Sequence, residues 1–147
     1  MEKKMKILAI VFLVVAAIGF LDATYLTAQH YSGNIPPCLI AGCEVVLVSP
    51  QSVIAGVPLA LLGSIYYLAL LILSIAYLDS KKKQFIRLAA YLAIAGFAAS
   101  LYFVYLQLFV IKEICQYCML SAGTSTTLFI LGLFILFKSK ETQALNV

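Results

Sequence analysis

The stretch CQYCMLSAGTSTTLFILGLFILF, residues 115–137, joins a Cys-x-x-Cys pair to an apolar run. A helix that crosses a bilayer needs about 20 residues, each adding about 1.5 Å. If Cys115 and Cys118 open such a helix, the unpartnered N–H groups of its first turn favour the thiolate form. The two thiols can also close a disulfide with each other. The stretch therefore predicts a redox-active dithiol at a membrane edge; a static disulfide or half of a zinc site is the alternative.

The composition around this stretch is that of an integral membrane protein. Hydrophobic residues make up 64% of the 147 residues and charged residues only 11%, whereas a soluble chain is about half apolar and a quarter charged. The length predicts one domain over residues 1–147. No repeat or low-complexity tract is evident, and the net charge of +4 is explained by topology rather than by a nucleic-acid partner.

Four apolar segments predict an all-α, membrane-embedded four-helix bundle, with helices at residues 7–28, 57–78, 88–111 and 114–137. The first segment follows three lysines, as in a secretory signal peptide. Its long apolar run and its poor small-x-small cleavage site favour a retained helix. The third segment is rich in alanine, which lets helix backbones approach closely in lipid.

Charge placement predicts the orientation of the bundle. Nine of the ten basic residues lie before the first helix, between the second and third, or after the fourth, and only Lys112 lies elsewhere. The positive-inside rule then puts both termini in the cytoplasm. The long loop of residues 30–57 faces the extracytoplasmic side of the plasma or inner membrane, as does the turn at Lys112. All four cysteines lie on that side, where disulfides persist.

The four cysteines predict a relay of two pairs. They allow three pairings, of which Cys38–Cys43 and Cys115–Cys118 are local and close small loops. Small loops stabilise little, so these bridges are better explained as exchangeable ones that pass two electrons through mixed disulfides. A zinc site built from all four sulfurs is the alternative, and we expect no metal.

The electron acceptor is predicted from the cofactor motifs that the sequence lacks and the aromatic residues that it contains. The sequence shows no haem motif and no nucleotide-binding glycine pattern, and a lipid-soluble quinone needs neither. Tyr66 and Phe103 would lie about 12 Å inside the outer edge of the bundle, in the same zone as Cys118 and Ala122; ordinary helix packing explains the aromatics equally well. Asp22 is predicted near the outer interface, either paired with a nearby hydroxyl or His30, or handling protons for the quinone.

These features resemble the vitamin K epoxide reductase family in its bacterial or archaeal branch, over nearly the whole chain. The matching features are the cysteine pair in the first outer loop, a Ser-Pro, a Gly-x-Pro-Leu-Ala-Leu-x-Gly stretch, a Cys-x-x-Cys that opens the last helix, and a Tyr-Leu-Thr at the end of the first. They stand here as Cys38/Cys43, Ser49-Pro50, residues 56–63, Cys115/Cys118 and Tyr25-Leu26-Thr27.

The resemblance implies a bundle around a quinone, either ubiquinone or menaquinone. It implies that Cys118 reacts with the quinone, that Cys115 receives electrons from Cys43, and that Cys38 contacts the external substrate. Ser49 matches the serine that helps bind the quinone carbonyl. Further pocket positions match Leu62, Tyr66, Tyr67 and Phe103, and Ala122 stands where vertebrate members carry a tyrosine.

The expected function is that of a membrane thiol:quinone oxidoreductase that supports disulfide formation in secreted proteins. Many bacterial relatives carry a fused thioredoxin-like domain, which these residues do not contain, so the expected electron donor is a separate, DsbA-like protein. One alternative is a DsbB-type quinone reductase, although that family places its Cys-x-x-Cys in the first outer loop. The other is a non-enzymatic membrane protein with static disulfides.

Overall fold

The computed structural model describes residues 2–33, 53–112 and 116–145. Four long helices dominate them, and the prediction of an all-α four-helix bundle is confirmed. A β-hairpin with two residues in each strand precedes the second helix, and a π-helical segment extends the third. The elements are α1 (Glu2–Ser32), β1 (Val53–Ile54), β2 (Val57–Pro58), α3 (Leu59–Ser80), α4 (Lys83–Tyr105), η2 (Leu106–Ile111) and α5 (Gln116–Leu145).

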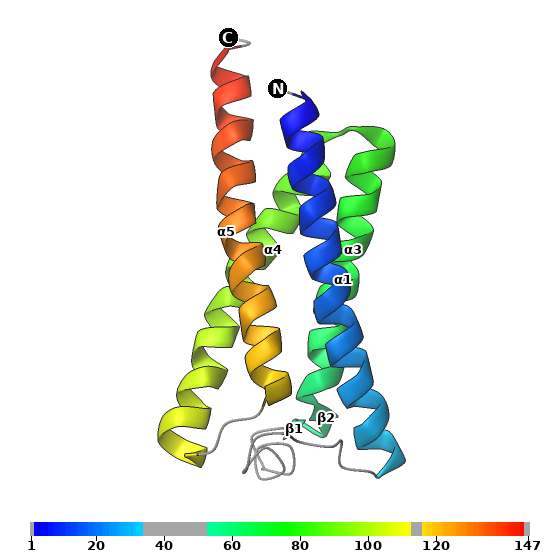
Figure 1. Cartoon of the computed structure of the whole chain (residues 1–147), viewed down its shortest axis with the longest axis vertical. Coiled ribbons are helices and arrows are strands. Elements are labelled where there is room, and N and C mark those ends of the chain that lie inside the picture. The colour runs from blue at the N-terminus through cyan, green and yellow to red at the C-terminus, as the bar shows by residue number, and fades with distance from the viewer. Residues whose placement is uncertain (1, 34–52, 113–115, 146–147) are drawn as a thin grey trace.

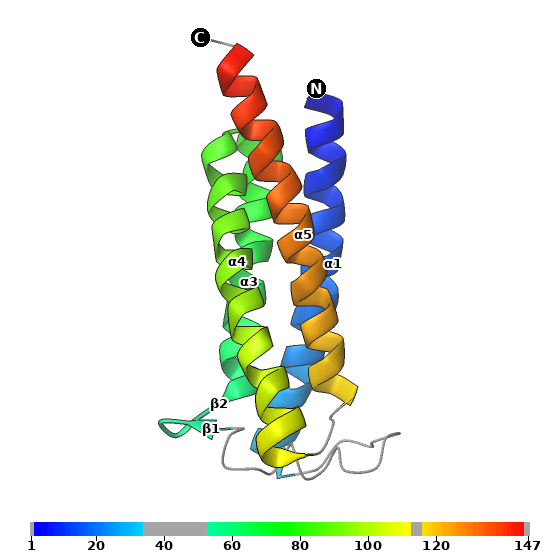
Figure 2. The ribbon, with the colours of Figure 1, turned by 90° about the vertical axis from the view of Figure 1, so that its left-hand side faces the viewer.

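The helices run up and down alternately, so that both termini lie at one end together with the turn between α3 and α4 (Figure 1). The end of α1, the β1–β2 hairpin and the start of α5 lie at the opposite end, which we call the hairpin end (Figures 1 and 2). Helix α1 packs against α3 and α5, and α4 packs against the same two helices. The order around the bundle is therefore α1, α3, α4, α5.

All four helices are long and apolar enough to cross a membrane, over Lys3–Ser32, Leu59–Ser80, Lys83–Ile111 and Gln116–Lys138. The helices α1, α4 and α5 extend beyond the apolar segments that predicted them. Apolar runs mark only the residues that hydrocarbon requires, whereas Lys, Glu and Gln are good helix formers that continue a helix into water. The helix bounds therefore differ from the predicted ones mainly at polar ends.

Helix α3 begins at Leu59 rather than at residue 57 because Val57 and Pro58 pair with β1. The hairpin turns at Ala55 and Gly56, whose φ angles of 53° and 84° are both positive, as a two-residue turn that matches the twist of its strands requires. Pro58 is extended and immediately precedes the helix. Its missing N–H leaves one fewer donor to satisfy there.

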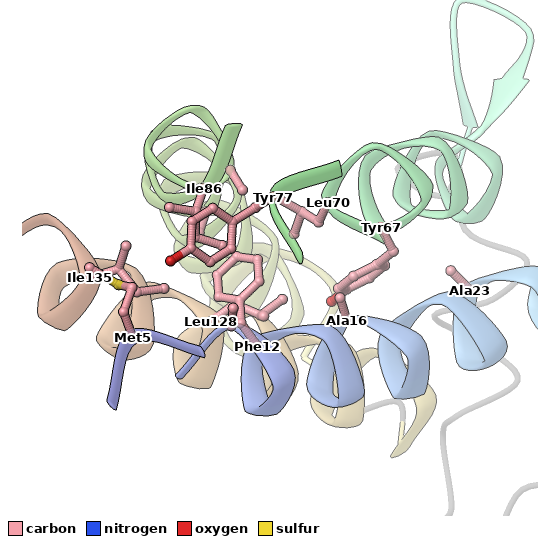
Figure 3. Close-up of a cluster of buried hydrophobic side chains, with 13 residues drawn as sticks. Met5, Phe12, Ala16, Ala23, Tyr67, Leu70, Tyr77, Ile86, Leu128 and Ile135 are labelled. Atoms are coloured by element: carbon pink, nitrogen blue, oxygen red, sulfur yellow. The ribbon is translucent and has the colours of Figure 1, made fainter. Parts of the chain in front are cut away.

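The interior is built from apolar side chains that recur every three or four residues along each helix. Figure 3 shows them converging, with Phe12 and Ala16 from α1 facing Leu70 from α3 and Leu128 from α5. On α4 the buried positions include Ala89, Ala90 and Ala93, where small side chains allow close packing. The outer surface is apolar as well, with Leu21 68% and Phe137 67% exposed. A surface of that kind suits contact with lipid.

Candidate functional site

Cys118 lies in the first turn of α5, at the hairpin end, and is half-buried. The first four N–H groups of a helix have no partner within the helix, and the helix dipole adds a partial positive charge there. These are the two effects from which the sequence analysis predicted a thiolate, and the thiolate itself stays a prediction. Next to it, the ring of Tyr117 lies 5.9 Å from the ring of Tyr25 on α1. The start of α5 is therefore held against α1.

Several of the predicted site residues lie outside the described residues. They are Cys38, Cys43, Ser49 and Cys115. Their roles stay predictions. Within the described part of the chain, no three His, Cys, Asp or Glu side chains are grouped so that they could hold a metal ion.

Tyr67 joins α3 to α5 close to Cys118. Its side chain is 1% exposed. Its hydroxyl donates to the carbonyl of Ser121 at 3.0 Å, and it shares further hydrogen bonds with Ser121 Oγ at 3.0 Å and Thr124 Oγ1 at 2.9 Å. Ser121 follows Cys118 by three residues, which is about 4.5 Å along the helix axis. A network of hydroxyl groups therefore lies about one helical turn deeper in the bundle than Cys118, the predicted thiolate.

Tyr66 points a second phenol toward α4 and α5. Its ring lies 5.0 Å from that of Tyr67, in an edge-on arrangement. A Cβ atom at Gly96 on α4 would collide with the Tyr66 hydroxyl, so the glycine makes room for it. Ser125 lies close enough for its side chain to interact, yet both hydroxyl oxygens are buried without a well-formed hydrogen bond among the described residues.

Asp22 contributes a third buried polar atom, Oδ2, that has no hydrogen-bond partner in the described ranges. Leaving such atoms unpaired costs about 1–3 kcal/mol each. The buried hydroxyl groups of Tyr66 and Ser125 are donors that could serve a carbonyl oxygen. Their chemistry is compatible with the quinone that the sequence analysis predicted.

The remaining predicted pocket residues lie less centrally. Leu62 is 40% exposed, and Phe103 and Ala122 are half-buried. The ring of Phe103 lies 5.4 Å from that of Tyr102. Their membership of the pocket stays a prediction.

Sequence reasoning did not place the hydroxyls of α5 in the site. Ser121, Thr124 and Ser125 stand at positions i, i+3 and i+4, and therefore share one face of the helix. Hydroxyl residues at that spacing in an otherwise apolar span were a usable signal, because each buried hydroxyl needs a partner.

Comparison with known protein families matches residues 10–133 to the vitamin K epoxide reductase family. Among curated proteins, no match was found. The family match covers most of the 147 residues, including the first turn of α5, the buried phenols of α3 and Asp22. The chain therefore belongs to the vitamin K epoxide reductase family.

Proposed function

We propose that this protein is a membrane thiol:quinone oxidoreductase that supports disulfide formation in secreted proteins. Family membership implies thiol–disulfide chemistry coupled to a quinone. The observation that carries the proposal is the position of Cys118, in the first turn of α5 and one turn from the hydroxyl network of Tyr67 and Ser121. A thiolate and hydrogen-bond donors at one place are what quinone reduction by a dithiol requires.

Electrons would enter from a separate, thioredoxin-like partner. Its dithiol reduces the Cys38–Cys43 disulfide and is itself oxidised to a disulfide. Cys43 then attacks the Cys115–Cys118 disulfide at Cys115, and the mixed disulfide is resolved by Cys38. The reduced pair closes again as two electrons pass from Cys118 to the quinone, which takes up two protons to become the quinol. Thiol oxidation and quinone reduction thus balance.

The pocket residues would bind and orient the ring. Ser49 and Tyr66 are candidate hydrogen-bond donors to the carbonyl oxygens, where negative charge develops on reduction. Leu62, Tyr67, Phe103 and Ala122 would shape the apolar walls. The quinone would be ubiquinone or menaquinone.

The proposed orientation follows from the basic residues. The end of the bundle that holds both termini also holds the α3–α4 turn (Figure 1), and nine of the ten basic residues lie in those segments. We place this end in the cytoplasm of the cell by the positive-inside rule. The hairpin end, with Cys118, would then face the compartment in which secreted proteins acquire disulfides.

Trapping of mixed disulfides tests the relay. The purified protein, supplied with a reduced thioredoxin-like donor and a soluble quinone analogue, should reduce the quinone and oxidise the donor in equal amounts. Cys43→Ser and Cys115→Ser should each stop electron transfer between the pairs. Cys118→Ser should accumulate a Cys43–Cys115 mixed disulfide, because Cys115, left without its own partner, can form a disulfide only by exchange with the Cys38–Cys43 bridge.

Two outcomes would contradict the proposal. Donor oxidation at the wild-type rate in Cys43→Ser would remove the loop pair from the path. Cysteine pairs that resist mild reductant and transfer no electrons would instead identify static disulfides in a non-enzymatic membrane protein.

A further inference from the structure

Asp22 is a carboxyl group buried inside a membrane helix. It lies in α1 within the span Lys3–Ser32, is 8% exposed, and leaves Oδ2 without a partner among the described residues. Ionisable groups inside membrane spans are costly and commonly mark a path for ions or protons. The electron relay described above does not use this group.

The register between α1 and α5 places Asp22 beside the hydroxyl network. The two helices pack against each other and run in opposite directions (Figure 1), and the contact of Tyr25 with Tyr117 fixes their relative height. Asp22 is three residues back from Tyr25, and Ser121 is four residues on from Tyr117. Residues three or four apart share a helix face. Asp22 and Ser121 therefore lie on the facing surfaces of α1 and α5 at the same level, about one helical turn deeper in the bundle than the contact of Tyr25 with Tyr117.

Tyr67 brings α3 to the same level. Its hydroxyl shares hydrogen bonds with Ser121 and Thr124 on α5, while its ring lies where a Cβ atom of Gly19 on α1 would be. Gly19 is one turn from Asp22 along α1. The Tyr67 hydroxyl and the Asp22 carboxyl lie close enough to interact electrostatically. Groups from three helices thus converge one turn inside Cys118.

Resting on the proposed function, we propose that Asp22 is a proton-relay residue, which passes a proton through the hydroxyls of Tyr67 and Ser121 to the quinone site beside Cys118. Each hydroxyl gives up its own proton as it receives another, so neither changes its net protonation. Asp22 acts through these groups and does not contact the quinone.

The proton count balances with the redox step. Oxidation of the Cys115–Cys118 dithiol forms one S–S bond and releases two electrons and two protons, one proton as the Cys118 thiolate forms and one from the Cys115 thiol. The quinone takes up two electrons and two protons. Asp22 supplies one of those protons, and the protons released from the two thiols provide the second and restore the Asp22 carboxyl.

Asp22→Asn tests the relay with little change of shape. Proton transfer by a positioned group contributes about 10²–10⁴-fold to a rate, so we expect kcat for quinone reduction to fall about tenfold or more while KM for the quinone changes little. Asp22→Glu, which keeps the carboxyl, should restore most of kcat. Asp79→Asn is the matched control, because Asp79 is exposed near the far end of α3, and it should leave kcat unchanged.

An infrared difference spectrum gives a second readout that needs no quinone. The spectrum of dithiothreitol-reduced minus oxidised protein should contain a carboxyl C=O band, because thiolate formation at Cys118 perturbs Asp22. The band should vanish in Asp22→Asn and persist in Asp79→Asn. A band that persists in Asp22→Asn, or none in the wild type, would overturn the inference.

The outcomes separate this inference from the proposed function. No quinone reduction by the wild type would refute the function itself. Normal quinone reduction by Asp22→Asn, or a loss that Asp22→Glu does not restore, would refute the relay alone. If Asp22→Asn does not fold, Tyr67→Phe takes its place: the relay requires the same loss of kcat at an unchanged KM, and an unchanged kcat refutes it.

Discussion

The hydroxyl of Tyr67 on α3 lies 2.9 Å from Oγ1 of Thr124 on α5, and these two helices stand across the bundle from each other. Helices α1 and α4 each pack against both of them. The Tyr67 side chain therefore crosses the interior of the bundle. Its hydroxyl makes a polar contact between α3 and α5, which are not adjacent around the bundle. The contact is set one to two turns inside the half-buried Cys118.

Tyr67→Phe should lower the stability of the bundle by a small amount. It removes three hydrogen bonds of one hydroxyl but leaves the ring in place, and Thr124 keeps its bond to the carbonyl of Ser121 at 2.8 Å. Hydrogen bonds between membrane helices are worth about 0.6 kcal/mol on average. We therefore expect the free energy of unfolding, measured in detergent, to fall by about 1 kcal/mol. Tyr91→Phe, at an exposed position of α4, should change stability by less than about 0.5 kcal/mol.

Gly19→Ala should cost more than an ordinary glycine substitution. The new Cβ atom would occupy the place of the Tyr67 ring, and overpacking of this kind costs about 1–3 kcal/mol. Gly123→Ala on α5 is the control, because its Cβ atom would meet nothing within 4 Å and alanine favours a helix over glycine by about 1 kcal/mol. Thermal unfolding should therefore move in opposite directions in the two variants. Equal shifts would contradict the close contact between α1 and Tyr67.

The number of helices could be predicted because hydrocarbon demands long apolar segments. The ends of the helices could not be predicted, because residues such as Lys83 and Gln116 are as acceptable within a helix as beside it. The hairpin at Val53–Pro58 was missed as well. Its signal is one Ala-Gly dipeptide, and alanine rarely adopts the positive φ that this turn gives to Ala55.

The place of Cys118 on its helix was predictable from the sequence, but the residues of other helices that lie opposite were not. Counting residues from the helix ends correctly put Cys118 in the first turn of α5. Counting residues along one helix does not show which residues of another helix lie opposite them. Tyr67 entered the prediction only through the family resemblance, and its bond to Ser121 depends on the rotation of α5 about its axis. The hydroxyl network could be found only once the helices were packed.

The proposed orientation predicts which engineered thiols an impermeant reagent reaches in intact cells. Ser32→Cys lies at the exposed end of α1 and Lys82→Cys in the exposed turn before α4, at opposite ends of the bundle (Figure 1). In a background with the four native cysteines replaced by serine, Ser32→Cys should be labelled from outside and Lys82→Cys only after lysis. The reverse pattern would invert the bundle in the membrane.

Ser49 is predicted to stabilise the charge that develops on a quinone oxygen. It precedes Pro50 in the uncharged stretch from residue 45 to residue 78, and a hydroxyl in apolar surroundings is costly to bury without a partner. A hydrogen bond to a charged oxygen in a dry site is worth about 1.5–3 kcal/mol. The hydroxyl would therefore act mainly on the rate of quinone reduction.

Ser49→Ala should keep the fold and both disulfides but slow quinone reduction about tenfold or more, because each 1.36 kcal/mol of barrier corresponds to about a factor of ten. Single-turnover reduction of a quinone analogue by the pre-reduced protein isolates this step from thiol exchange with the partner. Ser80→Ala is the matched control, since Ser80 is exposed at the far end of α3 and donates to the carbonyl of Ala76. Wild-type single-turnover kinetics in Ser49→Ala would place Ser49 outside the quinone site and leave the cysteine relay untouched.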